Sequence, residues 1–159
     1  MKIRKVTTKD LEDIDKIYVE GSIDEGKLQF PKVSKKEMIK NLEKHRKNRL
    51  KGFKDGILSN KDYWVVAIEK GKIISFGQAE IKNYEDDSNY CEVEKIYVKR
   101  EFRGMGVGKK LENGLFYWLK NKGTKKVFAR MYAKNSPSIK LHSSLGFEDF
   151  SITMMKRLK

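Results

Sequence analysis

Hydrophobic positions recur along this chain at helical spacing in some segments and alternate as in strands in others. Residues 3–6 alternate as in a short strand. Apolar residues then recur at helical spacing from Leu11 to Tyr18, behind Thr8 and Asp10, whose side chains favour the start of a helix. Residues 21–31, which begin with glycine and end with proline, predict a loop.

A second helix is expected over about Ser34–Leu58, because apolar residues fall on one of its faces: Met38, Leu42, Leu50, Phe53 and Ile57. The rest of this segment is strongly basic, with ten Lys and Arg against three acids over residues 35–61. Two β-rich segments follow, Tyr63–Glu69 and Lys72–Ile81, and the intervening Lys70-Gly71 predicts a hairpin turn.

The second half of the chain alternates strands and helices. After an acidic turn over residues 83–89, the pattern predicts a strand at Tyr90–Val98, a glycine-rich turn, a helix to about Lys122, a strand at Lys126–Ala133, a short helix at Ser136–Leu145 and a last β segment at Phe147–Lys156. No internal repeat, low-complexity segment or linker interrupts this order. We therefore expect one domain over residues 1–159, a mixed α/β sheet with helices on both faces.

The composition changes this picture through its charge. A chain of 159 residues with a formal charge of +14 indicates an anionic partner, such as nucleic acid, an anionic membrane or a phosphorylated ligand. The basic residues are 29 lysines and only 7 arginines, however, and the reading of base edges depends on the arginine fork. Nucleic acid is therefore not the expected partner. A nucleic-acid- or ribosome-associated module that uses the basic second helix stays an alternative.

The single cysteine, Cys91, excludes an internal disulfide framework and a cysteine-ligated zinc site, and no metal is expected. Apolar runs stay well below the roughly 18 residues needed to cross a bilayer. The first residues also lack the apolar core of a secretory signal. These features predict a cytoplasmic protein with no membrane partner.

The most specific stretch lies between a strand and a helix, where glycine occupies every second position: Gly104, Gly106 and Gly108. Such a backbone leaves its N–H groups unobstructed, and the helix that follows adds unpaired N–H groups and a positive dipole end. The turn therefore predicts a cradle for a phosphate or pyrophosphate. It is not a P-loop, because Arg103 stands where the first glycine belongs. It is not a dinucleotide fingerprint either, since that needs glycine at position 109 or 111.

At these residues the sequence resembles the GCN5-related N-acetyltransferases. The segment Arg103-Gly104-Met105-Gly106-Val107-Gly108 is similar to the family's Gln/Arg-x-x-Gly-x-Gly/Ala signature. Residues 135–147 are similar to its second signature, Asn-x-x-Ala-x-x-x-Tyr-x-x-x-Gly-Phe, and Ile96-Tyr97-Val98 resembles the strand that pairs with the pantetheine arm of acetyl-CoA. The resemblance covers nearly the whole chain and is weakest over residues 21–61. It implies a mixed, mostly antiparallel sheet of the GNAT type and an enzyme that transfers acetyl groups from acetyl-CoA to a primary amine.

The resemblance also implies which residues hold acetyl-CoA. Backbone N–H groups of the turn would bind the pyrophosphate and Arg103 would add charge, while the strand backbone would pair with the pantetheine amides. Asn135 would meet the cofactor or cap the next helix. The implied cofactor-binding residues are Ile96, Tyr97, Val98, Arg103, Gly104, Met105, Gly106, Val107, Gly108, Lys109 and Asn135.

Two residues are candidates for proton transfer. The acceptor amine must lose a proton before it attacks the thioester, and Glu92 occupies the position that resembles the family's glutamate base. Strand alternation predicts Glu92, Glu94, Ile96 and Val98 on one face, so Glu94 is the next candidate. His142 stands where the family has a tyrosine that returns a proton to the coenzyme A thiolate. An imidazole can serve as that acid, Tyr132 on the preceding strand can also reach the cleft, or the thiolate leaves unaided.

The sequence does not identify the acceptor amine, which can belong to a small molecule or a protein. The family binds it through the early helices, here about residues 20–61. The positive charge argues against polyamines and aminoglycosides unless an acidic rim forms from Asp24, Glu25, Glu85, Asp86 and Asp87. A homodimer is a possible assembly. A site that senses acyl-CoA without turnover is a further alternative.

Overall fold

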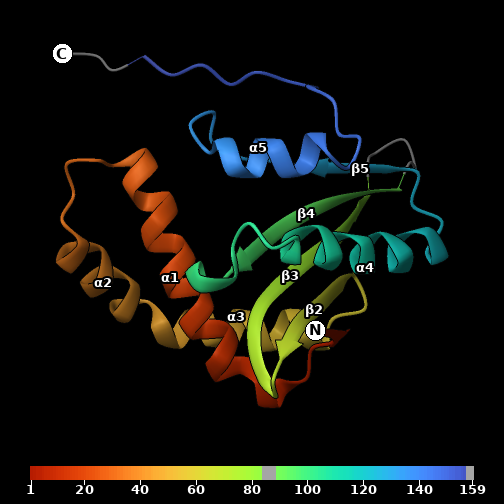
Figure 1. Cartoon of the computed structure of the whole chain (residues 1–159), viewed down its shortest axis with the longest axis horizontal. Helices are drawn as coiled ribbons and strands as arrows, with labels where there is room; N and C mark the ends of the chain where they lie inside the picture. Colours follow the sequence, from red (N-terminus) through yellow and green to blue (C-terminus); the bar gives the residue numbers. More distant parts are fainter. Residues whose placement is uncertain (84–88, 157–159) are drawn as a thin grey trace.

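The computed structural model describes residues 1–83 and 89–156, and its centre is a five-stranded sheet (Figure 1). The strands lie side by side in chain order: β1 (Lys2–Lys5), β2 (Asp62–Glu69), β3 (Lys72–Asn83), β4 (Asn89–Val98) and β5 (Lys126–Ala129). Neighbouring strands are antiparallel, except that β4 and β5 are parallel. The predicted mixed, mostly antiparallel sheet is confirmed.

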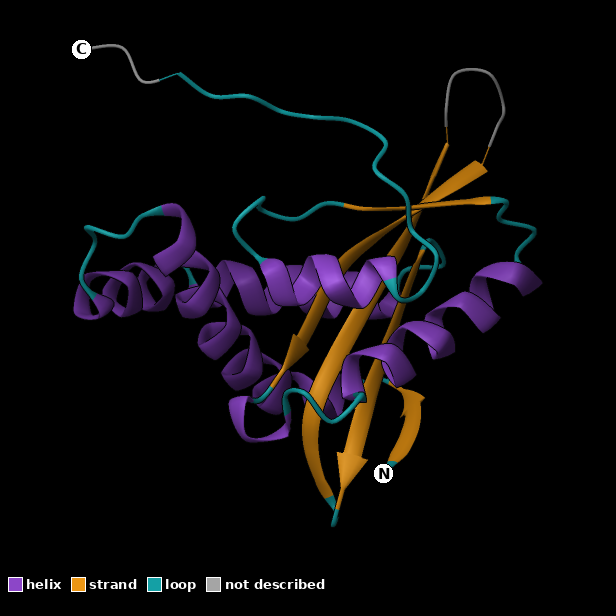
Figure 2. Ribbon diagram, turned by 45° about the horizontal axis from the view of Figure 1, so that its top comes forward, coloured by secondary structure: helices purple, strands orange, loops and turns teal. Residues whose placement is uncertain are grey.

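Helices cover both faces of this sheet (Figure 2). On one face α4 (Val107–Asn121) buries its apolar stripe against β2, β3 and β4, in a core that includes Val65, Ala79, Val93, Leu111 and Leu115. On the other face α1 (Leu11–Gln29), which follows the short 3₁₀ turn η1 (Thr8–Asp10), and α3 (Arg46–Leu58) form a second core that includes Ile14, Ile17, Phe53, Trp64 and Phe76. None of the described helices is long and apolar enough to cross a bilayer.

Helix α1 is longer than the sequence predicted, and the expected loop over residues 21–31 is wrong for residues 21–29. Gly21 is the reason for the error, because it permits a close contact rather than a turn. A Cβ atom built on Gly21 would lie 2.0 Å from a ring carbon of Tyr97 on β4. Glycine therefore lets α1 approach the sheet at this point, and the helix ends only before Phe30 and Pro31.

The expected second helix is divided at His45 into α2 (Lys35–Lys44) and α3. Ser34 caps α2 by accepting a hydrogen bond from the N–H of Glu37 at 3.2 Å. The two parts differ in burial, since α2 has no buried residue whereas α3 buries Phe53 and Ile57. The break therefore lets α3 pack on the sheet while α2 lies farther out against α1.

The hairpin prediction between β2 and β3 is confirmed. Lys70 and Gly71 both have positive φ angles, of 47° and 76°, as the tight turns of two-residue hairpins require. The acidic turn expected next includes residues 84–88, which lie outside the described residues.

The carboxyl-terminal part departs from the prediction. β5 ends at Ala129, four residues before the predicted boundary, and α5 (Ser136–Ser143) follows. The strand expected over Phe147–Lys156 is wrong for the described chain, because residues 147–156 pair with no strand there. The segment leaves the sheet and exposes its apolar side chains instead.

Candidate active site

The sheet opens beside β4, because β4 and β5 stay paired over only part of their length. Their pairing ends at Val93 with Ala129, whereas β4 continues along β3 as far as Val98. Within the described chain, residues 94–98 of β4 therefore have a strand on one side only. Backbone N–H and C=O groups on the open side can pair with an extended ligand as if it were another strand.

A β-bulge at Glu94 changes which side chains share a face of β4. Consecutive residues of β3 pair with Val93 and Lys95, so Glu94 is an extra residue in β4. Val93 before the bulge and Ile96 after it both pack in the core beneath α4. The predicted shared face of Glu92 and Ile96 is therefore wrong, since the extra residue shifts the alternation by one and turns Glu92 to the opposite face.

The glycine-rich turn between β4 and α4 has the conformation that an anion cradle needs. Gly104 and Gly106 have positive φ angles of 76° and 74°, and a Cβ on either would meet nothing within 4 Å. Gly108 serves packing, because a Cβ there would lie 3.0 Å from Leu141 of α5. The backbone N–H of Lys110 donates to Gly106 at 3.1 Å as the first turn of α4 closes, so the preceding N–H groups face outward from the helix end.

The remaining residues predicted in this turn lie where the sequence placed them. Met105 is exposed at the tip, Val107 is the first residue of α4 and is buried in the core, and Lys109 is exposed in the first helical turn. Ile96 and Val98 pack beneath α4 through their side chains. Their backbone belongs to the part of β4 that has a strand on one side only.

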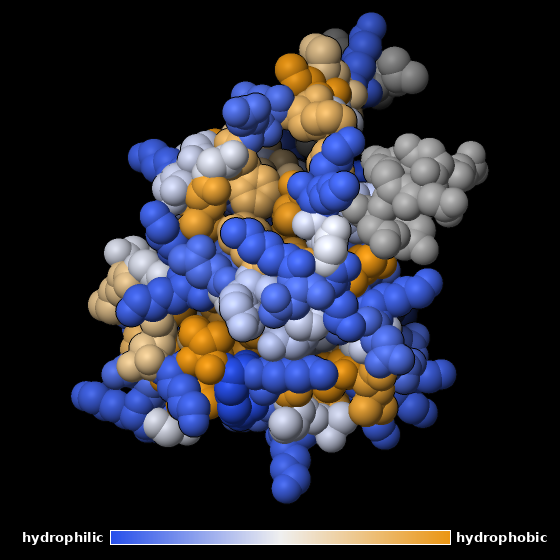
Figure 3. All heavy atoms as spheres, turned by 90° about the vertical axis from the view of Figure 1, so that its right-hand side faces the viewer, coloured by the Kyte–Doolittle hydropathy of each residue, from blue (hydrophilic) through white to orange (hydrophobic). Residues whose placement is uncertain are grey.

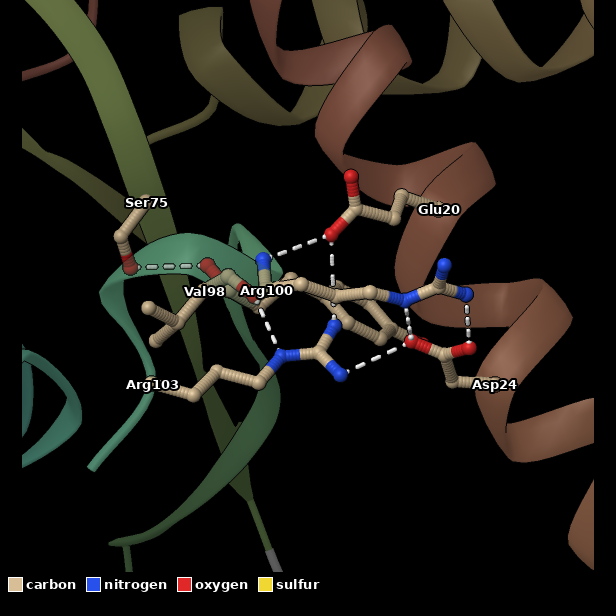
Figure 4. A network of polar contacts seen from close by, with 7 residues as sticks. Glu20, Asp24, Ser75, Val98, Arg100 and Arg103 are labelled. Atoms are coloured by element: carbon tan, nitrogen blue, oxygen red, sulfur yellow. Dashed lines mark hydrogen bonds and ion pairs between the residues drawn. The ribbon is translucent and has the colours of Figure 1, made fainter.

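Arg103 does not extend from the turn as a free cation. Its Nε donates to the carbonyl of Val98 at 2.8 Å and its Nη1 contacts Asp24 of α1 at 2.8 Å, while Arg100 of the short 3₁₀ turn η2 (Arg100–Phe102) pairs with the same carboxylate (Figure 4). Burial alone would raise the pKa of Asp24, but hydrogen bonds from both guanidinium groups hold it below its usual range. Arg103 therefore ties the turn to α1.

Glu92 is buried between two cations. Arg130, just after β5, contacts its Oε1 at 2.8 Å, and Lys82 of β3 contacts its Oε2 at 2.8 Å. Lys82 also binds Glu94 at 2.6 Å. Burial would lower the pKa of Lys82, but the hydrogen bonds to Glu92 and Glu94 outweigh it and hold this pKa above its usual range. The structure thus brings both candidate bases together around one lysine.

His142 lies on α5 and is buried, and both ring nitrogens lie close to polar protein atoms. Nδ1 lies 2.8 Å from the carbonyl of Ser138, and Nε2 lies 3.2 Å from Oε1 of Glu112 on α4. Glu112 is fully buried, and burial raises its pKa to about 7. These contacts favour a positioning role for His142, between α4 and α5, while its role as a proton donor stays a prediction.

Asn135 caps α5, which was one of its two predicted roles. Its side-chain oxygen accepts a hydrogen bond from the N–H of Ser138 at 3.3 Å, and a proline follows at the start of the helix. Contact with a cofactor stays a prediction for this residue.

A cavity of about 660 Å³ opens between α1 and α2 and reaches β4 at Tyr97. Its lining combines aromatic rings with two carboxylates and two lysines: Tyr18, Phe30, Tyr97, Tyr132, Glu25, Glu37, Lys40 and Lys44. The hydroxyl of Tyr97 donates to Glu25 at 2.7 Å, and burial together with this carboxylate raises the pKa of Tyr97 above its usual range. Of the predicted acidic rim, Glu25 lines the cavity and Asp24 is held by arginines, whereas residues 85–87 lie outside the described residues.

Three residues of this region were missed by the sequence analysis: Lys82, Glu112 and Arg130 as an ion-pair partner. The burial of Glu112 could have been predicted, because it lies three residues before Leu115 and therefore on the buried stripe of the helix. The ion pairs of Lys82 and Arg130 could not have been predicted, since they depend on how the strands pair. In the described part of the chain, no cluster of three or more His, Cys, Asp or Glu side chains is arranged for a metal ion.

Comparison with known proteins agrees with this geometry. The model of the acetyltransferase (GNAT) family matches residues 29–147. Aminoglycoside N(6')-acetyltransferase type 1 of Salmonella typhimurium, and the same enzyme of Salmonella enteritidis, are each 34% identical in an alignment of 90 residues that covers 53% of this chain. That match spans 61% of the length of each relative.

Solved structures share the fold at lower identity. A mutant of the BH1408 protein from Bacillus halodurans has a TM-score of 0.80 at 17% identity, over 100% of both chains. The aminoglycoside N-acetyltransferase AAC(6')-Iy, solved in complex with CoA, has a TM-score of 0.71 at 22% identity, over 99% of both chains. AAC(6')-IG from Acinetobacter haemolyticus has a TM-score of 0.70 at 17% identity, over 100% of this chain and 99% of its own.

Proposed function

The chain belongs to the acetyltransferase (GNAT) family, and from that premise we propose that it transfers the acetyl group of acetyl-CoA to a primary amine. The amine attacks the thioester directly, and no side chain is acylated. The observation that carries the proposal is the open side of β4 running into the glycine turn and the start of α4. An extended, phosphate-bearing ligand fits both parts of this arrangement.

Acetyl-CoA would bind through two sets of backbone contacts, one to its pantetheine arm and one to its pyrophosphate. Backbone groups of residues 96–98 would pair with the pantetheine amides, and a backbone N–H there would stabilise the thioester oxygen as it gains charge, a contribution of about 3 kcal/mol in comparable sites. The N–H groups from Gly104 to Lys109 would hold the pyrophosphate. The sequence predicted that Arg103 adds charge there. Because its guanidinium contacts Val98 and Asp24, we propose that it positions the cradle instead.

The proton of the attacking amine would pass to the carboxylates around Lys82. Glu92 and Glu94 both contact Lys82, and a carboxylate at this place can accept a proton directly or through water. Glu92 is the position that resembles the family's base, and Glu94 is the more exposed of the two.

The acceptor is a small cationic amine that enters the cavity between α1 and α2. Glu25 and Glu37 can bind ammonium groups, and the surrounding aromatic rings can pack against an aliphatic or sugar framework. The similarity to aminoglycoside N(6')-acetyltransferases makes aminoglycosides the first class to test. The lining also includes Lys40 and Lys44, so the two carboxylates make the cavity less positive than the chain as a whole without giving it a net negative charge.

The nucleic-acid-binding alternative is not favoured. Every arginine in the described chain pairs with a carboxylate, and Arg46 and Arg49 of the basic segment bind Asp15 of α1 at 3.0 and 2.7 Å. These two arginines therefore join α3 to α1 through ion pairs with Asp15. Hydrophilic residues cover most of the face drawn in Figure 3, as expected of a solvated, lysine-rich surface.

Calorimetric titration with coenzyme A tests the proposed cofactor site. In Gly106→Val the added side chain crowds the pyrophosphate cradle, and we expect the affinity for coenzyme A to fall at least about 100-fold, as loss of several N–H contacts implies. The matched control is Gly123→Val at the other end of α4. Gly123 has nearly the same φ angle, 75° against 74°, and a Cβ there also meets nothing within 4 Å. Equal affinities in the two folded variants would contradict the proposal.

A further inference from the structure

Side chains of α1 hold the segment that joins β4 to the glycine-rich turn (Figure 4). Asp24 binds two arginines at once: Arg100 donates to it through Nε, at 3.1 Å, and through Nη2, while Nη1 of Arg103 donates to it at 2.8 Å. One turn earlier on the helix, Glu20 accepts a hydrogen bond from the backbone N–H of Arg100 at 2.8 Å. This segment is therefore fixed to α1 through both its side chains and its backbone.

Arg103 connects three parts of the structure. Its Nε donates to the carbonyl of Val98, the last residue of β4, at 2.8 Å, while its Nη1 binds Asp24 on α1. Gly104, which follows it directly, is the first glycine of the turn. A guanidinium is planar and its N–H donors are fixed relative to one another. The carboxylate of Asp24 thus orients the group that holds the end of β4 beside the turn.

The placement of the two parts matters because acetyl-CoA would use both. In the function proposed above, the pantetheine arm pairs with β4 and the pyrophosphate lies on the glycine-rich turn. One ligand reaches both sets of backbone contacts only when they are held at the right separation. Binding and catalytic sites lose much of their function when their parts are misplaced by about 1 Å.

We propose that Asp24 is a positioning residue for acetyl-CoA, which sets the affinity by holding Arg100 and Arg103 rather than by touching the ligand; this role rests on the proposed function. The expected effect is opposite in sign to that of charge alone. Asp24 is an anion beside a site for a polyanion, so its removal would strengthen binding if only charge mattered, because two arginines would be released near the phosphates. If Asp24 acts by position, its removal weakens binding.

Calorimetric titration of the full chain with coenzyme A measures this sign. We expect Asp24→Asn to raise the dissociation constant at least about tenfold, and Asp24→Glu, which keeps the charge, to recover most of the loss. The matched control is Asp13→Asn, which changes the net charge equally on the same helix. Asp13 lies about 16 Å before Asp24 along the helix axis, is 55% exposed and pairs with Lys16, so this variant should bind coenzyme A within about twofold of wild type.

The thermal midpoint of each variant separates positioning from unfolding. Asp24 and its partners are partly exposed, and such ion pairs contribute little to stability, so we expect shifts below about 3 °C. A folded Asp24→Asn that binds coenzyme A as tightly as wild type, or more tightly, would overturn the proposal while the proposed function stands. Equal losses in Asp24→Glu or in Asp13→Asn would overturn it too. A wild type that does not bind coenzyme A would contradict both.

A double-mutant cycle tests whether Asp24 acts through the two arginines. In a chain that carries Arg100→Gln and Arg103→Gln, Asp24 has neither guanidinium to hold. Asp24→Asn should then change the dissociation constant for coenzyme A by less than about twofold, because residues that act as one network are not additive. A loss as large in this background as in the wild-type chain would mean that Asp24 acts by another route, and would overturn the proposal.

Discussion

Glu92 and Glu94 lie in different surroundings, which separates their expected roles. Each oxygen of Glu92 carries a cation, Arg130 on one and Lys82 on the other, and its side chain is 9% exposed. Of these two cations, Glu94 contacts only Lys82, and its side chain is 25% exposed. Glu94 is therefore the more accessible of the two carboxylates, and Glu92 is the one that contacts both Lys82 and Arg130.

Single amide substitutions test this division. We expect Glu94→Gln to lower kcat about 100-fold at pH 7, in the range usual for a general base, with partial recovery at alkaline pH as free amine accumulates. Glu92→Gln should lower kcat less than tenfold but reduce stability by about 1–3 kcal/mol, because two cations lose a partner. The measurements are kcat against pH and the thermal midpoint. A larger loss of kcat in Glu92→Gln than in Glu94→Gln would contradict this division and identify Glu92 as the base, as the family resemblance implies.

The buried Glu112 predicts a distinctive pH dependence of stability. Burial raises its pKa from 4.5 to about 7, so the folded protein keeps this proton over a range in which the unfolded chain releases it. Stability from this group is present below about pH 4.5 and is lost as pH rises to about 7, a change of about 3 kcal/mol. His142 is the titratable group that faces it, at 3.2 Å.

The matched variant for this pH effect is Glu112→Gln, which keeps the shape without the ionisation. We expect the difference in unfolding free energy between wild type and variant to change across pH 5–8. The wild type should become less stable relative to the variant as the pH rises. Urea unfolding at several pH values measures it. Parallel pH profiles for the two proteins would mean that Glu112 does not hold a proton in the folded state.

At the scale of elements, the contact of α1 with β4 depends on one missing side chain. Gly21→Ala places a methyl group against the Tyr97 ring, where a Cβ lies only 2.0 Å from a ring carbon, and we expect a loss of about 3 kcal/mol from overpacking. Gly52→Ala in α3 is the control, since a Cβ there meets nothing within 4 Å and alanine stabilises a helix by about 0.5–1 kcal/mol. Urea midpoints that shift equally would contradict the close packing of α1 on β4.

The same elements explain where the sequence could and could not predict local structure. The Lys70-Gly71 hairpin and the glycine turn were predictable, because their φ angles are set by the residues of the turn itself. The length of α1 was not, since Gly21 responds to a ring 76 positions away in the chain. The bulge at Glu94 depends likewise on how β3 pairs with β4, and strand periodicity cannot indicate it.

At the scale of the whole molecule, the mixed sheet and most of the order of elements were predictable from hydrophobic periodicity, except for the break between α2 and α3 and the absent last strand. The glycine motif indicated the candidate cofactor site. The arrangement of charges was not predictable, because the pairs join distant segments: Arg49 binds Asp15 across 34 positions, and Arg103 reaches α1 across 79. Residues 148–156 show the opposite case. They carry a strand pattern in the sequence, yet in the described structure they pair with no strand, so periodicity alone did not predict the pairing.

Acetyl transfer itself is the most direct test of the proposed function. Purified protein is incubated with acetyl-CoA and separate amines, namely an aminoglycoside with a free 6'-amine, a polyamine and a lysine-containing peptide, while free coenzyme A thiol is followed with a thiol reagent. The buried Cys91, whose pKa burial raises to about 12, should not react with it. We expect amine-dependent thiol release, greatest with the aminoglycoside, and an acetylated product by mass spectrometry. Coenzyme A binding without thiol release for any amine would contradict a transferase and favour an acyl-CoA sensor.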